Sequence, residues 1–116
     1  GYDDVAVGAP TTQAAQFPNI GVVTYFYGGA ARTGQSTNWF QGWNRDELVG
    51  HALASSGDIN GDGRDDTIVG AHLAVTGDGN GRFYLDYGQP TGIDAAFAAP
   101  EGATGEHFGF SLGAGR

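Results

Sequence analysis

The strongest structural signal in this chain is Asp58-Ile59-Asn60-Gly61-Asp62-Gly63-Arg64-Asp65-Asp66-Thr67-Ile68-Val69-Gly70. Its first nine residues place oxygen-bearing side chains at alternate positions of a glycine-rich turn, and its last four are three β-branched residues followed by a glycine. Gly61 and Gly63 let the backbone turn tightly without a Cβ penalty. The pattern indicates a tight loop that leads directly into a β-strand.

The loop predicts a calcium site, because hard divalent cations in proteins are held by several oxygen ligands. The expected ligands are the side chains of Asp58, Asn60, Asp62 and Asp66 and the backbone carbonyl of Arg64. The alternative is an acidic turn without an ion, but such turns rarely carry Asp or Asn at every alternate position. Four carboxylates within nine residues would also repel one another without a cation.

The loop resembles an EF-hand only in part. The twelfth position, which in an EF-hand is a bidentate Glu, is Val69. The flanking segments, Ala52–Ser56 and Thr67–Gly70, are short runs of small or β-branched residues, which favour strands over helices. A calcium site between two strands is therefore the better interpretation.

Composition predicts an all-β fold. The chain has 116 residues, of which 40% are apolar and 12% aromatic, enough for a packed core. Its 22 glycines separate short aromatic or β-branched runs, as in a fold built from strands and tight turns.

Charge and hydropathy exclude several classes of partner. The formal net charge is −8, and the five arginines are scattered singly, so nucleic acid is not an expected partner. No apolar run reaches 18 residues, so no membrane insertion is expected. The chain begins with Gly1 and shows no signal sequence, so we expect a piece of a longer precursor. An extracellular, secreted location is favoured because loops of this kind fill where calcium is plentiful, with dissociation constants of about 10⁻⁴ to 10⁻³ M.

The sequence repeats internally. Residues 1–10 match residues 63–72, so Gly8 and Gly70 are equivalent positions, 62 residues apart (70 − 8). Leu48-Val49-Gly50 matches His107-Phe108-Gly109 at a spacing of 59 residues (109 − 50), and residues 21–27 match residues 81–87. A period of this length is typical of repeat architectures such as propellers.

Each repeat divides into four short strands, the number in one propeller blade. In the second repeat we expect strands at Val49–Ser55, Thr67–Ala71, Arg82–Tyr87 and Ala95–Ala99. Residues 1–47 then form an incomplete blade with strands two to four, residues 48–104 a complete blade with the calcium loop, and residues 105–116 the first strand of the next blade, at His107–Gly113. This predicts two blades' worth of a β-propeller in permuted order, within a larger ring or oligomer.

Three segments, Phe108-Gly109, Asp58–Asp66 and Val7-Gly8-Ala9-Pro10, together resemble the FG-GAP repeat of integrin α subunits and of many secreted microbial propellers. The resemblance covers almost the whole chain and implies a calcium-binding blade with the ligands given above. Val49-Gly50 stands where the family has Phe-Gly, and His72 where it has Pro. Integrin-type propellers have seven blades, and integrin function itself does not follow.

No catalytic residue is expected. Gly109-Phe110-Ser111-Leu112-Gly113 matches a hydrolase nucleophile elbow, but no helix follows, and Ala52 stands at the position equivalent to Ser111. The histidines, His51, His72 and His107, lack the close spacing of a zinc motif and are more often packing residues.

Two further groups have alternative interpretations. Trp39, Phe40 and Trp43 are expected to pack between blades, with sugar stacking as the alternative. Asp78 and Asn80 fit a hairpin turn better than a second, weaker cation site.

These observations predict a calcium-binding recognition or adhesion module for a protein or glycan ligand. The alternatives are a structural scaffold or filament-forming blade pair, and the non-catalytic propeller of a polysaccharide-active enzyme. The expected partners, besides the ligand, are other blades of the same propeller or further copies of the chain. In that case the terminal strand of one copy would complete the first blade of its neighbour.

Overall fold

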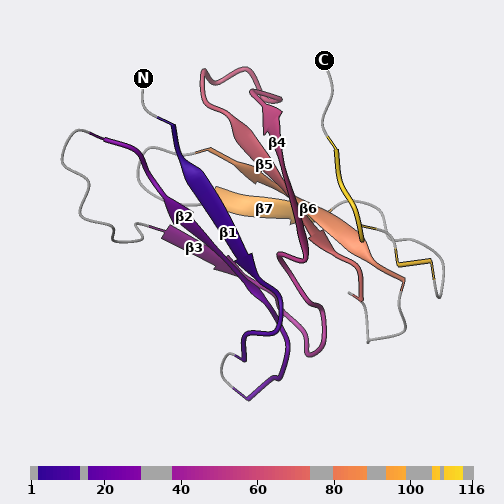
Figure 1. The fold of residues 1–116 in the computed structure, drawn as a ribbon. Helices are drawn as coiled ribbons and strands as arrows, with labels where there is room; N and C mark the ends of the chain where they lie inside the picture. The colour runs from indigo at the N-terminus through magenta and orange to yellow at the C-terminus, as the bar shows by residue number, and fades with distance from the viewer. Residues whose placement is uncertain are drawn as a thin grey trace.

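The computed structural model describes residues 3–13, 16–29, 38–73, 80–88, 94–98, 106–107 and 109–113. Across these residues seven strands form two antiparallel sheets, and no helix is present (Figure 1). The predicted all-β class is confirmed. A search of the same residues for a helix long and apolar enough to cross a membrane found none.

Both sheets are meanders, in which each strand pairs with the next one along the chain. The first sheet has the order β1 (Val5–Ala9), β2 (Val22–Phe26), β3 (Asn38–Gln41). The second has the order β4 (Ala52–Gly57), β5 (Asp66–Ala71), β6 (Arg82–Tyr87), β7 (Asp94–Ala98).

The opening strand of the second sheet begins later than predicted, at Ala52 and not at Val49. The reason is a tight turn, called here the first turn, at Leu48–His51. The amide of His51 donates a hydrogen bond to the Leu48 carbonyl at 3.2 Å, and Gly50 has φ +86°. A positive φ at the third residue of a turn requires a residue such as glycine, which explains Gly50.

The predicted terminal strand at His107–Gly113 is wrong in the described residues. They form a second turn, in which the Phe110 amide donates to the His107 carbonyl at 3.0 Å and Gly109 has φ +87°. His107 and its counterpart Leu48 also share a left-handed backbone, at φ +52° and +54°. Gly50 and Gly109, the glycines of the two matching segments, therefore lie in turns and not in strands.

Strand register repeats with the same spacing as the sequence. Val5 pairs with Phe26 and Ala9 with Val22 in the first sheet. Their equivalents pair in the same way in the second: Thr67 with Asp86, and Ala71 with Arg82. The third strands follow suit, since Thr24 pairs with Trp39 and Tyr84 with Ala98. Strands β1–β3 thus match β5–β7, whereas β4 has no counterpart among the described residues of the first sheet.

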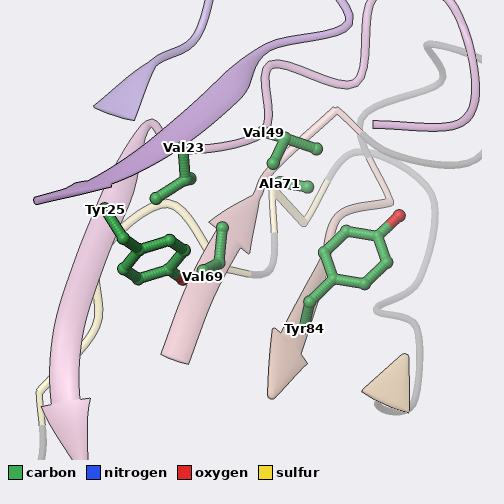
Figure 2. Close-up of a cluster of buried hydrophobic side chains, with 6 residues drawn as sticks. All are labelled: Val23, Tyr25, Val49, Val69, Ala71 and Tyr84. Carbon is green, nitrogen blue, oxygen red and sulfur yellow. The ribbon is translucent and has the colours of Figure 1, made fainter. Parts of the chain in front are cut away.

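The core lies between the two sheets. Its buried residues are Val23 and Tyr25 from β2, Val49 from the first turn, Val69 and Ala71 from β5, and Tyr84 from β6 (Figure 2). Ala6 and Leu53 pack against them. Burying a Val or Leu side chain contributes roughly 1.5–3 kcal/mol, so this shared cluster is the main attraction between the sheets.

The two sheets contact each other through faces that are not equivalent in the repeat. Val69 on β5 faces the first sheet and is 0% exposed, whereas its counterpart in the first sheet, Val7, lies on the open side of β1 and is 48% exposed. The first sheet meets the second with its opposite face, which carries Ala6, Val23 and Tyr25. The arrangement is head to tail, as in a stack of repeats.

Glycines allow each turn to sit directly on a strand. A Cβ on Gly8 of β1 would clash with the carbonyl oxygen of Gly50 in the first turn. A Cβ on Gly70 of β5, the equivalent position, would clash with the carbonyl oxygen of Gly109 in the second turn. Both contacts join backbone to backbone, so neither partner can move aside like a flexible side chain.

Replacing Gly8 with alanine should lower the free energy of unfolding by about 2 kcal/mol or more, because overpacking against backbone forces the sheets apart. Gly29 is the matched control, since a Cβ there meets nothing within 4 Å. Gly29→Ala should be neutral or stabilise by up to about 1 kcal/mol. Urea unfolding of both variants measures the difference. Equal stability of the two variants would contradict the close approach described above.

Candidate metal centre

The predicted calcium loop connects β4 to β5, at the top of Figure 1. Residues 58–65 are exposed, whereas Asp66, the first residue of β5, is 1% exposed. The loop therefore presents its polar side chains to solvent and is anchored by one buried carboxylate.

Asp58 organises the loop backbone. Its Oδ1 accepts hydrogen bonds from the amides of Gly61 at 2.7 Å and Asp62 at 2.9 Å, and its Oδ2 accepts one from Gly63 at 2.7 Å. The Gly63 amide, followed by those of Gly61 and Asp62, lowers the pKa of Asp58. The carboxylate is thus held in the charged form that binds a cation.

Asn60 and Asp62 turn toward the same part of the loop. The Asp62 amide donates to Asn60 Oδ1 at 3.0 Å as well as to Asp58 Oδ1. Side-chain oxygens of Asp58 and Asn60 therefore both contact the backbone nitrogen of Asp62. Asp62 itself accepts from Asn60 Nδ2 at 3.0 Å and from the Arg64 amide at 2.9 Å. Three of the predicted ligands are therefore close neighbours.

Asp66 has a separate structural role. Its Oδ2 accepts from the Ile59 amide at 2.8 Å and its Oδ1 from the Gly88 amide, just after β6, at 3.0 Å. Asp4, the equivalent residue of the first repeat, accepts from the Gly28 amide at 2.7 Å in the same way. The same carboxylate-to-amide bond therefore occurs at the start of the corresponding strand in both sheets.

The donor set fits a hard cation in chemistry but is not gathered into a closed cage. Among the described residues, no group of three or more His, Cys, Asp or Glu side chains is placed to hold a metal ion. A carboxylate offers about four lone-pair sites. Asp58 uses three of them and Asp62 and Asp66 two each, so each retains acceptor capacity for an ion. Calcium binding, including the role of the Arg64 carbonyl, stays a prediction.

A second buried carboxylate lies next to this anchor. Asp86 on β6 is buried, and burial, with the charge of Asp66 adding to it, raises its pKa to about 6. The nearby Tyr25 hydroxyl opposes the shift, and burial together with Asp86 raises the pKa of Tyr25 in turn. Sequence reasoning missed Asp86, although its alternation with the buried Tyr84 along β6 indicates an inward side chain.

Glu47, also missed, is a fully buried acid at the junction of the sheets. Its carboxylate accepts from the Trp43 amide at 2.8 Å, from Asn44 Nδ2 at 2.6 Å and from the Tyr84 hydroxyl at 3.4 Å. Burial and the Glu47 charge raise the pKa of Tyr84 to about 12. No sequence pattern distinguishes Glu47 from an exposed glutamate.

The aromatic residues divide between packing and exposure. Trp43 meets Tyr84 edge to face, with ring centroids 5.4 Å apart, so it does bridge the sheets. It is nevertheless 56% exposed. The side chains of Trp39 and Phe40 lie outside the described residues, as does Asp78. Asn80 has a buried Oδ1 without a hydrogen-bond partner in the described part of the chain.

The remaining predicted residues lie near the second turn. Ser111 is exposed and follows that turn. Its lack of a catalytic role stays a prediction. His51, His72 and His107, which are far apart in sequence, are brought together with Phe110. Their spacing in the sequence gave no sign of this cluster.

Asp66→Ala should destabilise the protein even with EDTA present, by about 2–4 kcal/mol, because two backbone amides lose a buried acceptor. Asp62→Ala, at an exposed position, should change stability by about 0.5 kcal/mol or less under the same conditions. Denaturant unfolding in EDTA separates the two effects. A small and equal loss in both variants would show that Asp66 has no role apart from calcium.

Comparison with known proteins gives no assignment. A scan against protein-family models found no match, and a search of the curated proteins found none either. The resemblance to the FG-GAP repeat therefore rests on residues of this chain and stays a prediction.

Proposed function

We propose that this chain is a calcium-binding segment of an extracellular β-propeller and serves as a recognition module for a protein or glycan ligand. The observation that carries the proposal is the loop between β4 and β5. In it, Asp58, Asn60 and Asp62 converge around backbone amides at the end of a sheet.

The repeated architecture supports the propeller. The second sheet has four antiparallel strands, the number in a propeller blade, and three of them recur in the first sheet with the same register. The sheets also pack head to tail, so that equivalent residues such as Val7 and Val69 lie on equivalent faces. Propeller blades repeat in this way around a central axis.

Calcium would supply the positive charge that this acidic loop lacks. Bound to Asp58, Asn60 and Asp62, it would fix the turn between β4 and β5. Asp66 would tie the same turn to Gly88, beyond β6, through its two amide bonds. The ion would thus rigidify one end of the second sheet.

The Trp43 region supports a recognition surface. Trp43 is an exposed indole, and Asn44 and Arg45 beside it are exposed as well. The Glu47 carboxylate accepts a 2.8 Å hydrogen bond from the Trp43 amide and so fixes the backbone that carries the indole ring. An aromatic face flanked by polar groups suits a sugar or a peptide.

Isothermal titration tests the calcium site. Wild-type protein should bind calcium and gain thermal stability with it, because a ligand that binds only the folded state stabilises that state. Asp62→Ala should weaken binding at least tenfold. Asp65→Ala, an exposed acid outside the alternating set, should leave the dissociation constant within about threefold. Unchanged binding in Asp62→Ala would refute the site.

Light scattering tests the propeller. The open Val7 face should receive the opposite face of another unit, so the calcium-saturated chain should form assemblies larger than a monomer. Val7→Asp should dissociate them, whereas Phe17→Asp, at another exposed apolar residue, should not. A stable wild-type monomer that unfolds cooperatively at every concentration tested would contradict the proposal.

A further inference from the structure

Three histidines form a contact cluster where the second turn meets the end of β5. The ring of His72, which directly follows β5, has its centroid 4.3 Å from that of His51 in the first turn and 5.7 Å from that of His107 in the second. The Phe110 ring closes the cluster, 4.7 Å from His51 and 5.0 Å from His72. One buried imidazole is therefore in contact with residues of both turns.

His72 is suited to this place only when neutral. It is 7% exposed, and its buried Nδ1 has no hydrogen-bond partner among the described residues. An imidazolium requires a partner for each ring N–H, and the described part of the chain places none at this nitrogen. Burial, and then the neighbouring His51 and His107, lower the pKa of His72.

Two charged side chains of the described residues, those of Arg82 and Glu106, lie close to the cluster in the sequence or in strand pairing. On β6, Arg82 pairs with Ala71 next to His72, but its guanidinium carbon lies 6.0 Å from the centroid of the Tyr84 ring. Glu106 precedes His107 and is exposed. The groups that influence the protonation of His72 are the two other imidazoles, which add charge of the same sign in acid.

The first turn provides an internal comparison. It sits on β1 through Gly50 and Gly8, as the second sits on β5 through Gly109 and Gly70. Pro10 occupies the position equivalent to His72, and Leu48 the position equivalent to His107. The two turn-to-strand contacts thus share a backbone geometry. The histidines at positions 72 and 107 of the second contact are replaced by apolar residues, Pro10 and Leu48, in the first.

We propose that this histidine cluster is a pH-sensitive contact, which holds the second turn on the end of β5 at neutral pH and releases it in acid. Release occurs on the acid side because the buried His72 ring gains a positive charge when it is protonated. Above about pH 6.5, the ordinary value for histidine, the buried His72 ring is neutral and packs against Phe110. As the pH falls below that value, protonation of His72 is favoured more in the released form than in the packed one, so the contact weakens.

Release would be local. The second turn is seated through Gly109, on the face of the second sheet that points away from the core. The Val69, Ala71 and Tyr84 core does not depend on it. The expected acid form therefore keeps both sheets and loses only the ring contacts of the cluster.

Nuclear Overhauser effects between aromatic rings test the proposal directly on the full chain. The effect between Phe110 and His51 should fall at least tenfold between pH 7.5 and pH 5.5. The effect between Trp43 and Tyr84, whose contact contains no histidine, should stay constant.

In His72→Phe, the intensity of the nuclear Overhauser effect between Phe110 and His51 at pH 5.5 should stay within about twofold of its value at pH 7.5. If that variant does not fold, His107→Leu is used, because leucine is the residue at the equivalent position, Leu48. This variant should reduce the decrease of the nuclear Overhauser effect in acid by more than half. A wild-type effect that is constant across this pH range would overturn the proposal. So would an unchanged acid loss in the variant that folds.

Discussion

The contact on which the packing of the two sheets depends is the approach of the first turn, at Gly50, to Gly8 in β1. Gly50 lies on Gly8, and Gly109 lies on Gly70, with no side chain between them. Such an approach brings the backbone of one unit onto the sheet of the previous one, which is possible only without a Cβ. Once the first turn is seated, Val49 enters the core beside Val23 and Val69. The position of the second sheet follows from this contact.

A second interaction is common to both units, the bond from a strand-leading aspartate to a glycine amide. Asp4 makes it to Gly28, and Asp66 makes it to Gly88. The aspartate therefore has the same structural role in both sheets. This explains why one residue of the predicted ligand set is buried while the other side chains are exposed.

The sequence predicted those features that depend on local pattern. The strand Arg82–Tyr87 has the predicted bounds, and β5 and β7 begin one residue earlier than expected. The Val-Gly and Phe-Gly segments were mistaken for strands because their left-handed residues, Leu48 and His107, have side chains that rarely adopt this conformation. Glu47, Asp86 and the histidine cluster were not foreseen, because their burial results from contacts between sheets and turns, which no single segment encodes.

The unlike faces of the two sheets have a consequence for growth. A pair that joins through one shared face buries that face in both partners and stops. Here the contact pairs the Tyr25 side of one sheet with the Val69 side of the next. Each added unit therefore covers the exposed face of its neighbour and exposes the equivalent face of its own sheet. Such a series ends only when curvature brings its last face to its first. The angle between successive sheets would then fix the number of units in a closed ring.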